Sequence, residues 1–309
     1  MKEKELVVNT KTNGSKSEDV VISISLVKKL RDATGAAMTS CKQALQEAKG
    51  DIEEAIKVLR KTNLAQMSSK LQRKADEGIV ALAVDNNKGA IIEIKFETDF
   101  VARNERLQKL ATEAVQLALV HDNLTDLKNA KLSSGETLES QISQDIAVIG
   151  ENIQVSRIRQ VKLVGNGIIA SYIHNSVARN LGQIAVLVAL EGNVESDKLT
   201  KLGKNIAMHI AATNPRFLSS NEVPESVIMQ EKEIFTAQAR ATGKPEKVIE
   251  KMIEGRVSKF LEETVLLEQA FVIDGKTKIS EVLSNAAKEL GSEIKITGFS
   301  CLKAGEVVE

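Results

Sequence analysis

The first part of the chain carries hydrophobic residues at helical spacing, interrupted by residues that end or begin helices. This pattern predicts a bundle of three short helices over 25–62. Gly35 is placed to end the first helix, and either residue of Thr39-Ser40 to begin the second. Asp51 would cap the third helix, with Glu54 as its capping-box partner.

Further along, an internal repeat predicts two related strand hairpins, each followed by a helix. Residues 78–84 resemble 167–173, and residues 85–89 have the composition of a hairpin turn. In the two copies, the second strand and the helix are expected at 90–96 and 105–120, and at 183–190 and 196–212. Further strands are expected at 153–157, 161–164 and 294–299, the last of them returning to the second sheet. The predicted class is α+β, with two stacked subdomains that contain antiparallel sheets.

A second helical pattern covers 225–263 and is broken at 242–245 by Gly and Pro. Two helices joined by so short a turn run antiparallel. We therefore expect a projecting, coiled-coil-like hairpin.

The segment 97–104 lies between the strand and the helix of the first copy. Asp99 can cap a turn there, whereas Phe100 has no regular element to pack into. Spacing alone favours a Phe100 that covers the end of its own core, and the alternative is a probe for another protein. The second copy has Glu-Gly-Asn-Val-Glu at 191–195 instead, so the duplicated scaffold does not require the Phe100 sequence. This difference favours the probe.

The amino-acid composition limits the classes of function that this chain can have. A chain of 309 residues predicts two or three domains, and 42 basic against 42 acidic residues argue against a broad nucleic-acid surface. Trp is absent and Tyr172 is the single tyrosine, which argues against stacking on bases. Cys41 and Cys301 lack metal-ligand spacing and fit reduced thiols of a cytoplasmic protein. No membrane span or signal peptide is expected, and 1–22 is expected to be a flexible tail.

No motif for nucleotide binding or catalysis stands out. The chain lacks a phosphate-binding loop of the Gly-x-x-x-x-Gly-Lys-Ser/Thr type. His209 lies among apolar helix residues and is expected to be packed, whereas His174 at a strand end fits packing or partner contact equally. We therefore expect no enzyme, no cofactor and no metal site.

Thr-Asp-Phe-Val-Ala-Arg-Asn at 98–104 closely resembles the signature loop of the bacterial elongation factor Ts family, which often has Lys at the position of Arg103. Residues 26–55 resemble the family's N-terminal domain, which has a ubiquitin-associated-like fold. Residues 243–246 and 250–256 resemble a second family signature. The resemblance runs collinearly over 24–305; the tail has no counterpart, and some members continue beyond the position of Glu309 into a further helical module.

The resemblance implies a guanine-nucleotide exchange factor that binds elongation factor Tu and promotes GDP release. Thr98, Asp99, Phe100 and Val101 would enter the GTPase near its Mg²⁺ site, with Phe100 as an apolar wedge and Asp99 as a polar anchor. Further candidate contact residues are Met38 on a turn, Lys42, Arg103, Asn104 and His174. Whether an oligomer larger than the heterodimer forms stays open. The alternative is a ubiquitin-associated-like binding adaptor without exchange activity.

These inferences predict the following division of the chain: a tail (1–22), a three-helix domain (23–63), a helical linker (64–77), a first core subdomain (78–164), the first part of a second core subdomain (165–224), a helical hairpin (225–263), and the rest of the second subdomain with the C-terminus (264–309).

Overall fold

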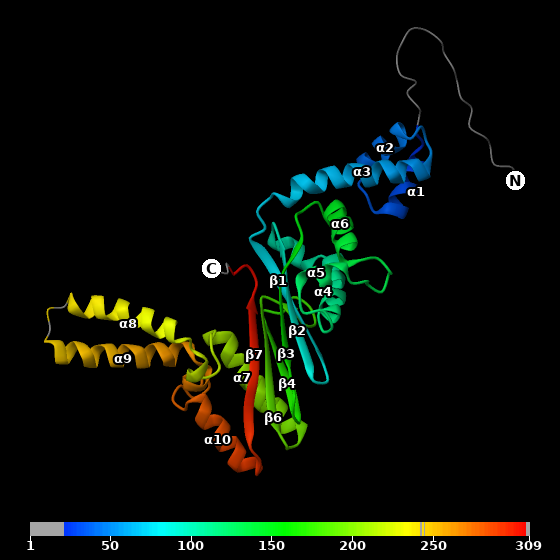
Figure 1. Ribbon diagram of the computed structural model, residues 1–309. Helices are drawn as coiled ribbons and strands as arrows, with labels where there is room; N and C mark the ends of the chain where they lie inside the picture. The colour runs from blue at the N-terminus through cyan, green and yellow to red at the C-terminus, as the bar shows by residue number, and fades with distance from the viewer. Residues whose placement is uncertain (1–21, 242, 244, 307–309) are drawn as a thin grey trace, which may run out of the picture. The chain divides into compact units, whose positions relative to one another are not determined.

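The computed structural model describes residues 22–241, 243 and 245–306 (Figure 1). The chain divides into two compact units, 1–68 and 69–309. Apart from Ile22, the predicted tail lies outside the described residues.

The helices are α1 (Ile24–Thr34), α2 (Met38–Glu47), α3 (Ile52–Leu71), α4 (Glu105–Leu117), α5 (Leu124–Asn129), α6 (Leu138–Ile149), α7 (Ser196–Thr213), α8 (Glu225–Arg240), α9 (Glu246–Thr264) and α10 (Ile279–Leu290). Short 3-10 turns are η1 (Asp99–Arg103), η2 (Ser220–Glu222) and η3 (Leu266–Glu268). The strands are β1 (Glu77–Asp85), β2 (Lys88–Phe96), β3 (Gln154–Lys162), β4 (Gly167–His174), β5 (Leu181–Gly182), β6 (Ile184–Gly192) and β7 (Ile294–Lys303).

The first unit packs α1, α2 and the start of α3 around a small apolar core. The buried residues of this core are Val27, Leu30, Ala36, Cys41, Ala44, Leu45, Ala55 and Leu59. Gly35 ends α1 as predicted, in the left-handed conformation with φ 70°, and its N–H donates to the Arg31 carbonyl at 2.7 Å. The N-terminal helices of the sequence-based prediction are thus confirmed.

Two details of helix capping in this unit differ from the prediction. Neither residue of Thr39-Ser40 caps α2, because the extended Ala37 already starts the helix at Met38. Asp51 does cap α3, since its Oδ1 accepts the Glu54 N–H at 2.9 Å. The reciprocal half of the capping box is missing: the Glu54 carboxylate pairs with Lys57 at 3.0 Å instead.

In the described part of the second unit, the strands form two antiparallel sheets, ordered β3-β2-β1-β5 and β4-β6-β7. The hairpin turn predicted between β1 and β2 is confirmed, since Asp85 pairs with Lys88 and Asn86 between them has a positive φ of 47°. The sheets pack face to face through an apolar layer that combines Val80, Leu82, Ile91 and Val161 with Ile169, Ala185, Leu187, Ala189 and Leu302. The predicted α+β class with antiparallel sheets is therefore confirmed.

Each copy of the sequence repeat forms a hairpin followed by a helix. Helix α4 packs on β1 and β2, and α7 packs on β4 and β6 (Figure 1). Gly203 allows α7 to approach β4 closely, because a Cβ at this position would lie 2.4 Å from the Ala170 Cβ. Helices α5, α6 and α10 were not predicted, although the buried Leu138, Ile142 and Ile146 of α6 do follow helical spacing.

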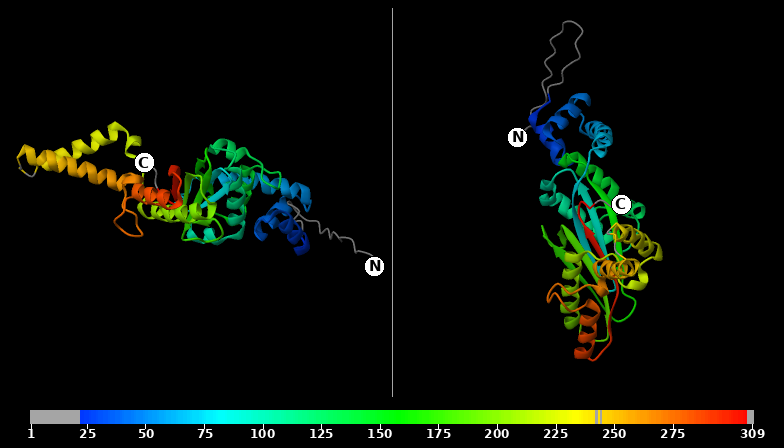
Figure 2. Two further views of the ribbon diagram at one scale, coloured as in Figure 1. Left: turned by 90° about the horizontal axis from the view of Figure 1, so that it is seen from below. Right: turned by 90° about the vertical axis from the view of Figure 1, so that its left-hand side faces the viewer.

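Helices α8 and α9 pack against each other and project from the rest of the second unit (Figures 1 and 2). Pro245 precedes the first turn of α9, and the two helices bury Ala239 and Ile249 respectively. The predicted helical pair is thus present at 225–264. None of the described helices is long and apolar enough to cross a membrane.

Candidate functional site

The Phe100 loop, residues 97–104, connects strand β2 of the first sheet to helix α4. Strand β2 ends at the buried Phe96, and the chain then turns through η1. The Asn104 side chain caps α4, since its Oδ1 accepts the N–H groups of Arg106 at 2.9 Å and Leu107 at 3.4 Å. The loop therefore lies between two regular elements.

Within η1, neighbouring side chains point in opposite directions. Phe100 is 81% exposed, whereas Val101 is 5% and Ala102 is 9% exposed. The alternative in which Phe100 covers its own core is therefore wrong, because Val101 and Ala102 fill that position. An aromatic ring with so large an exposed fraction leaves apolar area open for another molecule.

Two charged residues of the loop lie close to Phe100 in η1 and are exposed, as Phe100 is. Asp99 and Arg103 are both exposed. Thr98, and not Asp99, is the N-cap residue of η1, and its side chain makes no capping hydrogen bond, so the expected cap by Asp99 is wrong. The turn closes instead through backbone bonds, with the Val101 N–H donating to the Thr98 carbonyl at 3.2 Å.

A single carboxylate holds the start of the loop. Glu151 accepts the N–H groups of Glu97 at 3.1 Å and Thr98 at 2.9 Å through Oε2, and the Thr98 hydroxyl donates to its Oε1 at 2.6 Å. Glu151 directly follows Gly150, which ends α6 in the left-handed conformation with φ 92°. The end of α6 thus fixes the point where the loop leaves the sheet.

The same helix also holds the other end of the loop. Arg106, in the first turn of α4, forms an ion pair with Asp145 of α6, and Gln141 donates to the same Asp145 oxygen at 3.0 Å. Asp145 is fully buried, and its second oxygen has no partner among the described residues. Burial raises the pKa of the Asp145 carboxyl, against the opposing effect of Arg106 and Gln141.

Glu97 completes the support of the loop. Its Oε1 accepts the Asn152 N–H at 2.7 Å and lies 3.6 Å from Arg73 Nη1. Sequence reasoning missed Glu151, Asp145 and Asn152 because they lie in the segment around α6, for which no element was predicted. The helical spacing of α6, with Gly150 as its end, was the signal available.

The remaining predicted contact residues belong to other elements than the loop. Met38 is 40% exposed and Lys42 is exposed; both lie in the first unit on α2. Met38 was expected on a turn, but it is the first helical residue. His174 ends β4 in the second sheet, where its Nδ1 lies 3.1 Å from the Tyr172 hydroxyl. The predicted residues of 98–104 thus share one loop, whereas these three belong to α2 and β4.

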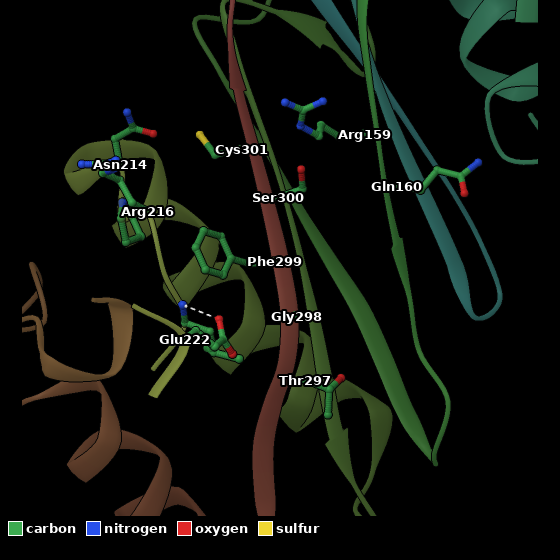
Figure 3. Close-up of a pocket in the computed structure, with 12 residues that line it drawn as sticks. Arg159, Gln160, Asn214, Arg216, Glu222, Thr297, Gly298, Phe299, Ser300 and Cys301 are labelled. Carbon is green, nitrogen blue, oxygen red and sulfur yellow. Dashed lines mark hydrogen bonds between the residues drawn. The ribbon is translucent and has the colours of Figure 1, made fainter. Parts of the chain in front are cut away.

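A hollow of about 410 Å³ lies beside β7 and is lined by residues of β7, of β3 and of the segment after α7 (Figure 3). Arg159 and Arg216 contribute exposed guanidinium groups, while Glu222 accepts the Leu218 N–H at 3.2 Å. Burial raises the pKa of the Cys301 thiol to about 11, so this lining residue stays protonated at neutral pH. The lining residues offer no paired nucleophile and base.

No group of three or more His, Cys, Asp or Glu side chains in the described ranges is arranged to hold a metal ion. His209 is buried, as predicted.

A sequence model of the family described as "Elongation factor TS" matches residues 97–306, a range that includes the Phe100 loop. The chain is 98% identical to the elongation factor Ts of Orientia tsutsugamushi (strain Boryong) over 309 residues, which is 100% of both chains. It is 44% identical to that of Rickettsia bellii (strain OSU 85-389) over 292 residues, 94% of each chain. It is 45% identical to that of Rhodospirillum centenum (strain ATCC 51521 / SW) over 290 residues, 93% of this chain and 94% of the relative.

Proposed function

The chain belongs to the elongation factor Ts family, and we propose that it binds elongation factor Tu in its GDP form and promotes GDP release during translation elongation. The observation that carries the proposal for this chain is the exposed Phe100 on a loop anchored at both ends. A rigid loop with an exposed aromatic is the kind of element that inserts into a partner.

Phe100 acts as an apolar wedge. Its ring enters between helices of the GTPase close to the Mg²⁺ site, and the displaced helices then no longer support the Mg²⁺ ligands. The metal and GDP leave together. Asp99 anchors the loop in the partner, which fits the exposed position of this residue beside Phe100.

The other candidate residues widen the contact. Thr98 and Val101 shape the loop on either side of Asp99 and Phe100, and Arg103 and Asn104 lie at its C-terminal end. Met38 and Lys42 belong to a three-helix domain of the ubiquitin-associated-like type, which grips another part of the GTPase domain. His174 belongs to the second core subdomain, which reaches a different domain of the partner.

The finer domain plan is part of the same proposal. We assign the helical pair at 225–263 as an antiparallel coiled coil inserted in the second core subdomain, and the remaining boundaries are those predicted from the sequence. The protein acts in the cytoplasm, and it catalyses no chemical reaction of its own.

An adaptor role for the first unit alone gives the Phe100 loop no function. Such an adaptor would bind a ubiquitin-like partner through its helices and leave the exposed aromatic of the second unit unused. No observed feature of α1–α3 favours it over the exchange factor.

Release of labelled GDP from elongation factor Tu tests the proposal. The chain should accelerate release at concentrations far below that of the GTPase, since each molecule acts repeatedly. Alone, it should neither hydrolyse GTP nor bind GDP tightly. Unchanged GDP release, or tight GDP binding by the isolated chain, would overturn the proposed function.

A further inference from the structure

The hydrogen bonds of β2 stop just before the Phe100 loop. On one side, the pairing of β2 with β3 ends at Lys95 opposite Gln154; on the other, the pairing with β1 ends at Phe96 opposite Glu77. The next two N–H groups, of Glu97 and Thr98, have no strand to bind. Both instead donate to Oε2 of Glu151. At the end of β2, the Glu151 carboxylate thus accepts the backbone N–H groups that a neighbouring strand would bind within the sheet.

The third bond in this cluster comes from the side chain of Thr98. Its hydroxyl donates to Oε1 of Glu151 at 2.6 Å, so the carboxylate accepts bonds on both oxygens. Hydrogen bonds to an ionised acceptor are shorter and stronger than those between neutral groups. Thr98 is exposed, yet its hydroxyl is engaged within the chain.

Phe100 has little packing of its own to fix its direction, because its side chain is 81% exposed. Its placement depends on the residues on either side. Before it, Glu151 holds Thr98; after it, Val101 and Ala102 are buried, and Gln108 Nε2 donates to the Ala102 carbonyl at 3.0 Å. A group held in its binding geometry before the encounter loses less freedom on binding.

We propose that Glu151 is a positioning residue for nucleotide exchange: by holding Thr98 it sets the direction in which Phe100 is presented. We call the hydrogen bonds between Glu151 and Thr98 the latch. Thr98 contributes to the latch through its hydroxyl and is not a contact with the partner. The inference rests on the proposed function of the Phe100 loop.

The first test removes the carboxylate. Glu151→Ala should lower the efficiency of GDP release from elongation factor Tu by about ten-fold, because a small misplacement of an acting group has large kinetic effects. The matched control is Glu139→Ala, which removes an exposed carboxylate from the first turn of α6, the helix that ends shortly before Glu151. Activity of Glu151→Ala equal to that of the control, beside a strongly impaired Phe100→Ala, would overturn the latch.

A double-mutant cycle separates positioning from general support of the fold. If Glu151 acts through Phe100, adding Glu151→Ala to Phe100→Ala should lower exchange by less than about two-fold further, whereas independent effects multiply. A full ten-fold further loss in the double variant would overturn the proposal, since a merely structural role for Glu151 predicts this result.

Thr98 provides a milder pair of variants in case Glu151→Ala does not fold. Thr98→Val keeps the shape and removes the hydroxyl, and should lower exchange by about three-fold, as one of three bonds to the carboxylate is lost. Thr98→Ser restores a hydroxyl and should recover most of that loss. Equal activity of the two variants would contradict the latch.

The same experiment distinguishes failure of the latch from failure of the loop. Full activity of Phe100→Ala would overturn the proposed function of the loop, and the positioning role with it. A strong loss in Phe100→Ala, together with normal activity in the Glu151 and Thr98 variants, would overturn the positioning role alone.

Discussion

At the scale of single residues, the neighbours Phe100 and Val101 in η1 differ in their exposure and therefore in their roles. Val101 is buried and holds the turn to the core, whereas Phe100 is exposed and contributes little to the stability of the free chain. A side chain that is left uncovered in the free state is available to a partner without a prior rearrangement of the core.

Phe100→Ala should therefore separate stability from activity. The free energy of unfolding should change by less than about 0.5 kcal/mol, as for other surface substitutions. Loss of an aromatic hot spot costs about 2 kcal/mol or more in a complex, which corresponds to roughly thirty-fold in exchange efficiency. Thermal unfolding and GDP release, measured on one preparation, check both values. Val101→Ala is the informative contrast, because it removes a buried side chain from the same turn and should lower stability.

His209 on α7 joins this helix to the segment after η3. Its Nδ1 accepts the Val272 N–H at 3.3 Å, its Nε2 lies 2.9 Å from Gln269 Oε1, and its ring meets Phe271 at a centroid distance of 5.8 Å. Nδ1 is thus the acceptor and Nε2–H the donor, which is the neutral imidazole. Burial lowers the pKa of His209, against the opposing effect of the bond to Gln269.

This lowered pKa predicts a pH dependence of stability. In the unfolded chain a histidine pKa is about 6.5, so on acidification the unfolded state takes up a proton before the folded state does. The contribution of His209 is therefore present above about pH 6.5 and is lost as the pH falls through the lower, folded pKa. Chemical unfolding between pH 7 and 5 should show this slope in the wild type. His209→Gln should lack it, whereas His174→Gln, at an exposed histidine, should keep it; the same slope in His209→Gln would contradict the assignment.

At the scale of elements, the α8–α9 pair is attached to the second unit at its base. There the Phe217 N–H donates to the Thr264 carbonyl at 3.1 Å, and the Leu266 N–H donates to the Phe217 carbonyl at 2.9 Å. Val265 and Leu266 are fully buried immediately after α9. These base contacts lie outside 225–263, so they do not need the projecting part.

Replacing 225–263 by a short linker should leave both sheets folded. The described residues of the deleted helices include few buried ones, and the two helices pack mainly on each other. Thermal unfolding of the deletion variant should stay cooperative. Deletion of α10 is the matched contrast, because its Ile279 and Leu283 belong to the core of the second sheet, and this variant should lose the cooperative transition. Loss of cooperativity in the hairpin deletion would show that the helical pair is part of the core.

At the scale of the whole molecule, exchange requires that the protein and the nucleotide oppose each other on the GTPase. A factor that bound the nucleotide-free and GDP forms equally would shift nothing, however tight its binding. Because coupling between two ligands is reciprocal, GDP must weaken binding of the factor by the same ratio as the factor weakens GDP.

Titration calorimetry with nucleotide-free and GDP-loaded elongation factor Tu measures this ratio. The factor should bind the nucleotide-free form more tightly by at least about five-fold, the lower end of typical couplings. Phe100→Ala should bring the two affinities closer together, because it removes the wedge that competes with the Mg²⁺ site. Equal affinities for the wild type would exclude exchange by displacement.

Features that depend on neighbouring residues follow from the amino-acid sequence alone. Asn86 favours the positive φ that the β1–β2 turn requires, Gly35 provides the left-handed residue at the end of α1, and Asp51 provides the side chain that caps α3. Hydrophobic spacing and the internal repeat likewise identified the two hairpin-plus-helix units and the α8–α9 pair. These are short-range effects, because a turn or a helix end is stabilised by residues a few positions away.

How these elements support the candidate site depends on contacts between residues that lie far apart in the sequence. Thr98 and Glu151 lie 53 positions apart in the sequence. Likewise, the carboxylate of Glu93 is buried in the apolar strand β2, where it accepts hydrogen bonds from Arg157 Nε of β3 at 2.7 Å and from the Gly305 N–H at 2.8 Å. The exposure of Phe100 beside the buried Val101 depends in the same way on what packs beneath the turn. A local pattern records which side chains are polar or apolar, but the partner of a buried charge is set by which strands and helices come together, because burial without such a partner is too costly to persist.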